Sequence, residues 1–153
     1  MKRPILTLLP ICALTFSTQL QAQDEEAAVK AVIETLFDSM READSAKLHS
    51  VFIDDVVMQT IIPKRGVMSI NEGSLQGFLR GVGTPHEHVY DERILDYQIK
   101  IDGPMASVWT PYQFYLGEEF SHCGVNSFQL MKTEEGWKII YLVDTRRIKD
   151  CPQ

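Results

Sequence analysis

The residues best suited to chemistry lie in the stretch EFSHCGVNSFQL, residues 119–130, where a histidine directly precedes a cysteine. The pair His122 and Cys123 fits three interpretations: a catalytic thiolate beside an imidazole, two ligands of a metal site, or a structural cysteine. The compartment of the protein helps to separate them, because an oxidising environment converts free thiols to disulfides.

The N-terminal segment has the order of a secretory signal peptide. Two basic residues precede an uncharged apolar run from Ile5 to about Phe16, and a polar stretch then ends at Ala22. The run is shorter than the roughly 20 residues that span a bilayer. The sequence therefore predicts a signal peptide over residues 1–22 and an exported protein, periplasmic or secreted, whose residues 23–153 form a single domain.

Only two cysteines stay in the mature chain once Cys12 leaves with the signal peptide. In an oxidising compartment the simplest expectation is a disulfide between Cys123 and Cys151. On the chain-entropy account, closing a loop of this length stabilises the fold by roughly 3.5 kcal/mol. The alternative, a catalytic role for Cys123, needs a free thiolate and competes with this oxidation.

The net charge of the chain argues against some classes of binding partner. The formal net charge is −6, and it becomes −8 when Lys2 and Arg3 are removed with the signal peptide. An acidic domain lacks the basic footprint that nucleic-acid phosphates require, and nothing indicates a membrane surface after cleavage.

Hydrophobic spacing predicts helices in the first half of the chain and strands in the second. Apolar residues recur at helical spacing from Val29 to Met40, and Asp44 is a plausible N-cap for a short second helix. A strand that stops at Pro63 and a third helix over residues 69–82 follow. Alternating apolar and polar residues then predict four strands, at 93–103, 105–116, 118–132 and 137–147. This order predicts an α+β domain.

The segments READSAKLHSVFIDDVV (residues 41–57) and GWKIIYLVDTRR (136–147) resemble the nuclear transport factor 2-like superfamily. Residues 91–147 are similar to small exported bacterial proteins of its SnoaL-like or putative lumazine-binding branch. The resemblance implies a cone-shaped fold, with three N-terminal helices packed on a curved, mostly antiparallel sheet and an open pocket. It does not imply one chemistry, because this fold hosts many functions.

Alternation along the predicted strands assigns a ligand-binding pocket. In the strand around His122 the set Phe120, His122, Gly124, Asn126, Phe128 and Leu130 shares the more apolar, inward face, which places Cys123 on the outside. The same reasoning on the other strands adds three tyrosines. The predicted pocket residues are Tyr97, Tyr112, His122, Asn126 and Tyr141.

Within this pocket His122 is the candidate catalytic residue, as a general base, but a core histidine hydrogen-bonded to Tyr112 or Asn126 is the interpretation that we favour. Asp144 alternates with Lys138, Ile140 and Leu142, opposite the face of Trp137, Ile139, Tyr141 and Val143. We therefore expect it to form an ion pair with Arg146 or Arg147, unless a bulge turns it inward. The sequence predicts no pair of inward carboxylates.

Metal and cofactor motifs are weak. The tripeptide HEH, residues 86–88, supplies two imidazoles, but no further ligand has a matching spacing, so we expect no metal. No phosphate-binding glycine loop or nucleophile elbow indicates a cofactor or a serine hydrolase. Arg146 and Arg147 are able to receive an anionic ligand, with a salt-bridged strand end as the alternative.

Three functions remain open. The first is a binding domain that holds a small, partly apolar molecule. The second is an acid/base enzyme of isomerase, dehydratase or hydrolase type that uses His122, with Tyr112 and Asn126 beside it. The third is a homodimer or interaction domain that pairs through the outer sheet face carrying Trp109 and Tyr115.

Overall fold

The computed structural model describes residues 14–151, which form three helices and a seven-stranded sheet. The helices are α1 (Leu14–Glu42), α2 (Ser45–His49) and α3 (Leu75–Gly83). The strands are β1 (Phe52–Lys64), β2 (Val67–Glu72), β3 (Tyr90–Ile94), β4 (Gln98–Asp102), β5 (Met105–Leu116), β6 (Glu119–Thr133) and β7 (Gly136–Thr145). Residues 1–13 of the predicted signal peptide lie outside the described part, and within 14–151 no helix is long and apolar enough to cross a membrane.

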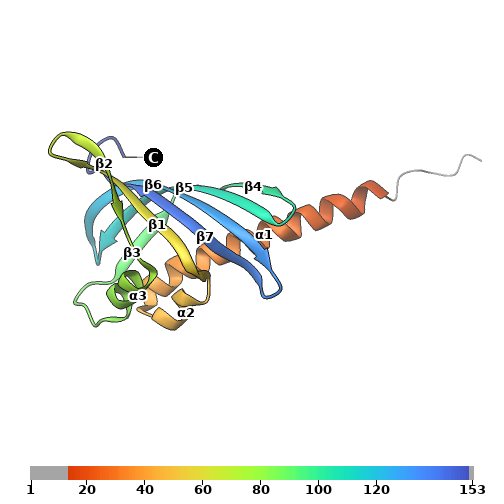
Figure 1. The fold of residues 1–153 in the computed structure, drawn as a ribbon, viewed down its shortest axis with the longest axis horizontal. Helices are drawn as coiled ribbons and strands as arrows, with labels where there is room; N and C mark the ends of the chain where they lie inside the picture. The colour runs from red at the N-terminus through yellow and green to blue at the C-terminus, as the bar shows by residue number, and fades with distance from the viewer. Residues whose placement is uncertain (1–13, 152–153) are drawn as a thin grey trace, which may run out of the picture.

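The sheet is curved and mostly antiparallel, as predicted, and it does not close. The strand order is β2-β1-β7-β6-β5-β3. The strand β4 also pairs with β5, along the first half of β5, whereas β3 pairs with its second half. The β1–β7 pair is parallel, whereas the remaining strand pairs are antiparallel. Figure 1 shows the strands arching over α1, with α2 and α3 beneath β1 and β7.

The core lies between this concave face and α1. Five apolar side chains at helical spacing on α1 are buried, which confirms the stripe expected there: Val29, Ile33, Leu36, Phe37 and Met40. They pack with buried side chains of β5 and β6, for example with the Phe37 and Phe128 rings 6.3 Å apart, edge to face. Asp44 caps α2 as predicted, by accepting hydrogen bonds from the amides of Ala46 and Lys47.

The strands β1 and β2 form a hairpin, which differs from the structure predicted for residues 54–82. The strand does not stop at Pro63 but continues to Lys64, because its pairing with β7 ends at Ile61 and the strand then needs a partner on one side only. Arg65 and Gly66, with φ values of 52° and 82°, form a two-residue turn into the unpredicted β2. The third helix therefore begins later than predicted, after the N-cap Ser74.

The single strand expected over residues 93–103 is wrong, since β3 and β4 are separate strands. Both pair with β5, β3 with its second half and β4 with its first half, and Leu95 between them donates its amide to Pro111 O at 2.9 Å. The break changes which residues face inward. Leu95 is 40% exposed, whereas Tyr90, Glu92 and Ile94 of β3 pack towards the core.

Beyond β7 the chain stays beside β6 as far as Arg147, before it reaches Cys151. Cys123 and Cys151 form the expected disulfide, and the backbones of Cys123 and Arg147 exchange hydrogen bonds of 2.8 and 2.9 Å. Cys123 lies on the face opposite the helices, as expected, but it is fully buried because this segment covers it. A thiolate nucleophile at Cys123 is incompatible with this bonded state.

Candidate functional site

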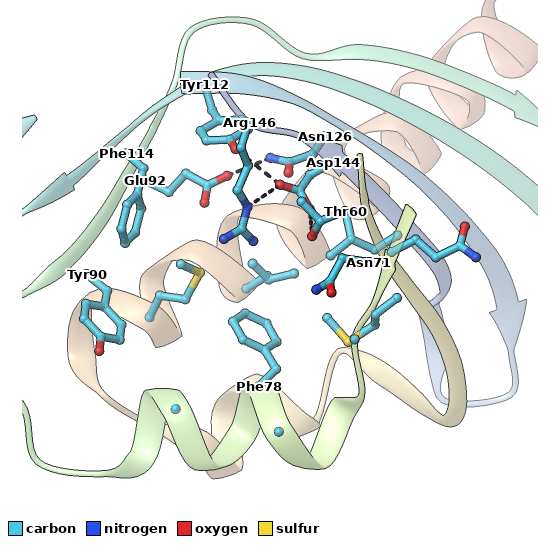
Figure 2. A pocket seen from close by; sticks show the side chains of 18 of the residues that line it. Thr60, Asn71, Phe78, Tyr90, Glu92, Tyr112, Phe114, Asn126, Asp144 and Arg146 are labelled. Carbon is cyan, nitrogen blue, oxygen red and sulfur yellow. Dashed lines mark hydrogen bonds and ion pairs between the residues drawn. The ribbon is translucent and has the colours of Figure 1, made fainter. Parts of the chain in front are cut away.

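A cavity of about 690 Å³ lies between the concave face of the sheet and the helices α1 and α3. One wall is apolar, because Leu36, Phe37 and Met40 of α1 and Phe78 and Val82 of α3 line it. The opposite wall is the sheet, and there the lining includes several polar side chains, drawn in Figure 2. A mixed lining of this kind is typical of sites for small organic molecules.

The polar side chains form a row that crosses the sheet from β1 to β5. Thr60 is the register partner of Asp144, Asp144 of Asn126, and Asn126 of Thr110. Because register partners lie side by side on one face, each of the four strands contributes one polar group at the same level. Glu92 of β3 extends the row, since Asn126 Nδ2 donates to Glu92 Oε1 at 2.7 Å.

Next to Thr60 in this row, Asp144 is surrounded by donors. Its Oδ1 accepts from the hydroxyl of Thr60 at 2.6 Å, and its Oδ2 accepts from Arg146 Nε at 2.8 Å and from the Tyr112 hydroxyl at 3.4 Å. The same Tyr112 hydroxyl donates to Thr145 O at 3.0 Å. Burial raises the pKa of Tyr112, so this phenol stays protonated and serves as a donor.

At the β3 end of this row, Glu92 is a buried carboxyl that titrates near neutrality. Burial raises its pKa to about 7; the charge of Asp144 acts in the same direction, while the hydrogen bond from Asn126 and the charge of Arg146 oppose it. Its residue surface is 9% exposed and it lines the cavity. A carboxyl with these properties is able to give or take a proton at physiological pH.

His122, the candidate general base, also lines the cavity but stands apart from the polar row. Its ring contacts Phe114 and Tyr112, with centroids 5.0 and 5.8 Å away, and its Nδ1 lies 3.1 Å from the Ser121 hydroxyl. Burial and the charge of Arg146 lower its pKa, so the imidazole is neutral at pH 7. The geometry fits an aromatic-packed histidine better than a residue coupled to Asn126.

The expectation of no pair of inward carboxylates is wrong, because Asp144 and Glu92 both line the cavity. The pairing of β6 with β7 shifts at Gln129, where Gln129 pairs with Tyr141 and Leu130 with Ile139, so that Ile140 is an extra residue. One extra residue inverts the alternation beyond it. Leu142 and Asp144 therefore face the cavity, and Asp144 also forms the expected ion pair with Arg146.

Two of the five residues predicted to line the pocket lie elsewhere. Tyr112, His122 and Asn126 line the cavity, but Tyr97 and Tyr141 are not among its lining residues. The Tyr141 hydroxyl bonds to Gln59 Oε1 at 2.5 Å on account of the same bulge, and Tyr97 carries Lys30 over its ring at 4.9 Å. A second bulge, at Ser121, turns the predicted inward residue Phe120 outward, where it is 43% exposed.

Glu92 was missed because the expected strand began at Arg93 and placed Leu95 inward. The available signal was the alternation of Tyr90, Glu92 and Ile94, which puts a carboxyl between two large apolar residues. A lone charged residue on an apolar face is expensive to bury and is for that reason a candidate for function.

The remaining sequence candidates lie outside the cavity. The His86 ring stacks on Tyr90 at 3.9 Å, and among the described residues no group of three His, Cys, Asp or Glu side chains is arranged to hold a metal. On the outer sheet face Trp109 is 48% exposed, whereas Tyr115 is covered by Arg93, 3.9 Å from its ring centroid.

Comparison with known proteins agrees with this architecture. The family described as Putative lumazine-binding matches residues 24–143, which is most of the chain. No curated protein matches the chain in sequence.

Several solved structures share the fold. An NTF2-like protein of unknown function from Shewanella baltica has 17% identity and a TM-score of 0.65, covering 81% of this chain and 94% of its own. An NTF2-like protein with a cystatin-like fold from Novosphingobium aromaticivorans has 10% identity and a TM-score of 0.72, covering 92% and 93%. A "putative dehydratase from the NTF2-like family" of Streptomyces avermitilis has 17% identity and a TM-score of 0.63, covering 84% and 99%. At these identities the likeness establishes the fold, which confirms the nuclear transport factor 2-like expectation, and leaves the reaction to the site.

Proposed function

The chain belongs to the Putative lumazine-binding family, and we propose that its cavity binds a small, partly apolar organic molecule. The observation that carries this proposal is the polar row on the sheet facing the apolar wall of α1 and α3 across about 690 Å³. Ligand sites of drug-sized molecules span about 300–1,000 Å³ and combine an apolar lining with a few fixed polar groups. The family description supports the same class of ligand.

The proposal is tested by filling the cavity without disturbing its walls. Gly81 of α3 lines the cavity, and a Cβ added there meets no atom within 4 Å. Gly81→Leu therefore places a side chain in the ligand space, and it also replaces a glycine in a helix, which costs about 1 kcal/mol relative to alanine. We expect this variant to fold at least as stably as the parent protein and to lose ligand binding.

The measurement is a thermal-shift screen of a diverse metabolite library against three proteins: the parent, Gly81→Leu and Gln76→Leu. Gln76 is exposed on the same helix and does not line the cavity, so it provides a matched leucine control. A ligand at about one hundred times its dissociation constant adds roughly 2.7 kcal/mol, a rise in Tm of about 10 °C. Hits that survive in Gly81→Leu would place binding outside the cavity and contradict the proposal.

Acid–base catalysis on the bound molecule is a second candidate function, with Glu92 in the role first assigned to His122. It is favoured by a carboxyl that titrates near neutrality and contacts the cavity. Glu92→Gln keeps the acceptor for Asn126 but cannot transfer a proton. If a library hit is converted by the protein, we expect this variant to bind it and to leave it unconverted, whereas His122→Ala should retain turnover.

Export with cleavage after Ala22 accords with the contacts of α1. The predicted bond lies within α1, and Glu25, three residues further on, reaches the sheet through Trp137 Nε1 at 3.0 Å and Lys132 Nζ at 2.5 Å. A mature chain that starts at Gln23 keeps these contacts. Mass spectrometry of the exported protein should give Gln23 as the first residue, and a start beyond Glu25 would contradict this expectation.

Pairing of two copies through the outer sheet face is compatible with ligand binding. Met105 and Met131 are register partners and are 52% and 42% exposed, close to the exposed Trp109 of the same strand, β5. An exposed apolar group of this kind is a candidate interface. Sedimentation of the parent protein and of Trp109→Lys tests it: a dimer that the substitution dissociates supports pairing here, and a monomeric parent protein rejects it.

A further inference from the structure

Arg146 is the one lysine or arginine among the residues that line the cavity. It directly follows the last residue of β7, Thr145, and its side chain is 51% exposed. The cavity therefore has a single fixed positive group, placed where the polar row meets the open side. The charge and direction of this group bear on the ligand.

The guanidinium of Arg146 is bonded to the protein through its Nε edge, and its Nη edge faces the cavity. Its Nε donates to Asp144 Oδ2 at 2.8 Å, while within residues 14–151 its two Nη atoms have no hydrogen bond or ion pair. In Figure 2 these two terminal nitrogens point into the space between the sheet and Phe78. A guanidinium presents its donors as a planar fork that matches a carboxylate with two parallel hydrogen bonds.

Asp144 fixes the orientation of the Arg146 guanidinium. Its carboxylate is itself fixed by the hydroxyls of Thr60 and Tyr112, and its residue surface is only 7% exposed. Because the carboxylate is anchored in the sheet, the Nε edge of Arg146 is anchored with it. The Nη edge is thus oriented before a ligand arrives, which lowers the entropic cost of binding.

We propose that the ligand of this cavity carries an anionic group, a carboxylate in the simplest case, and that Arg146 binds it through its Nη atoms. This inference rests on the proposed function, since it names the chemical class of the molecule that the cavity holds. The ligand is then an organic acid, with its apolar body against α1 and α3 and its charged end at Arg146.

The titratable groups around the cavity give this inference a pH dependence. Asp144 lies near the end of β7 and Arg146 directly after it, Tyr90 and Glu92 lie on β3, Tyr112 on β5, His122 on β6 and Glu72 on β2, while the cavity-lining residues of α1, α3 and β1 are uncharged. An anion bound at Arg146 disfavours the ionised form of Glu92, so binding is accompanied by proton uptake. Affinity for the anion falls as Glu92 ionises, from slightly acidic to slightly basic pH.

The experiment compares 2-naphthoate with its neutral isostere 2-naphthamide in NMR titrations of the isotopically labelled protein. We expect naphthoate to bind at least about tenfold more tightly near pH 6, and its affinity to fall up to about tenfold by about pH 8. Arg146→Gln should abolish the preference for the acid, and Arg146→Lys, which keeps the charge without the fork, should keep part of it. Glu92→Gln, which stays neutral, should bind naphthoate with little pH dependence.

Arg147→Gln is the matched control, because it removes the same charge from the adjacent residue, whose Nε bonds to Asp150 O and which does not line the cavity. An equal loss in Arg147→Gln would overturn a specific site at Arg146 in favour of general charge attraction. Equal or tighter binding of the amide in the cavity would overturn the anionic class and leave the proposed function intact. If neither probe perturbs cavity resonances at millimolar concentration, this inference fails, and the proposed function is judged by the Gly81→Leu comparison alone.

Discussion

Asn126 and Glu92 are joined by a 2.7 Å hydrogen bond on the concave face, although their strands, β6 and β3, are separated by β5. The same amide nitrogen lies 3.4 Å from the hydroxyl of Thr110 on the intervening strand. The bond runs diagonally across β5, because the register partner of Glu92 on that strand is Phe114 and that of Asn126 is Thr110. It counteracts the burial that raises the pKa of Glu92, and it thereby tunes the one carboxyl of the cavity that titrates near neutrality.

The free energy of unfolding should depend on pH through the ionisation of Glu92. Its pKa is about 7 in the folded protein against an ordinary 4.5, so the folded state holds a proton that the unfolded chain has released between these values. This group therefore contributes stability that is fully present below the unfolded pKa and is lost as the pH rises through the folded pKa, by about 3 kcal/mol in total. Urea unfolding of the parent protein and of Glu92→Gln at about pH 5 and about pH 8 measures the difference, which the variant should lack. Glu134→Gln, an exposed control in the β6–β7 turn, should keep it.

Removal of the amide at position 126 should raise the pKa of Glu92 further. In Asn126→Leu the carboxylate loses its hydrogen-bond donor while burial stays, and an unpaired buried polar group costs about 1–3 kcal/mol of stability at pH values where Glu92 is ionised. Carbon-13 NMR titration of the glutamate side-chain carboxyls reports the pKa directly. A pKa unchanged from that of a Ser127→Ala control on the same strand would show that the hydrogen bond does not set it.

Gly124 should tolerate no side chain. A Cβ there would lie 1.7 Å from Thr145 O, a backbone atom that also accepts the hydrogen bond of Tyr112. We expect Gly124→Ala to lose about 3 kcal/mol or more of unfolding free energy and to disturb the Tyr112 hydroxyl. Gly81→Ala, in open space on a helix, should instead gain about 0.5–1 kcal/mol, so the two alanine variants should differ in sign. Chemical denaturation of both decides the point.

The disulfide should stabilise the fold through its loop. Cys123 and Cys151 are 28 residues apart, and opening a loop of this length costs roughly 3.5 kcal/mol. Cys151→Ser is the cleaner variant, because Cys123 is fully buried and Cys151 is only half-buried. Its loss of stability should match that of the reduced parent protein in denaturant titrations. A Cys151→Ser variant as stable as the oxidised parent would indicate that the C-terminal segment is held by the Cys123–Arg147 backbone pairing alone.

Much of the fold follows from short-range patterns. The helical stripe of α1, the cap at Asp44 and the alternation in β5 and β6 are local properties, and the structure confirms the elements that they predict. Alternation along β5 and β6 also gave the inward positions of Tyr112 and Asn126, because the pairing of residues 105–114 with residues 122–131 contains no irregularity. The resemblance to the nuclear transport factor 2-like superfamily added the curvature of the sheet.

The composition of the site was decided by tertiary structure. A period of two fixes only which residues share a face, and a single extra residue reverses that assignment for everything beyond it. The extra residue Ile140 brings Asp144 into the cavity and takes Tyr141 out, and the break at Leu95 brings in Glu92. β7 pairs with both β1 and β6, and β5 pairs with both β3 and β4 along one edge, and no local pattern records these pairings. The sequence therefore determined most of the elements and many of their faces, but not β2 or the division of β3 from β4. The sheet pairing determined that Glu92, Asp144 and Arg146 share one cavity.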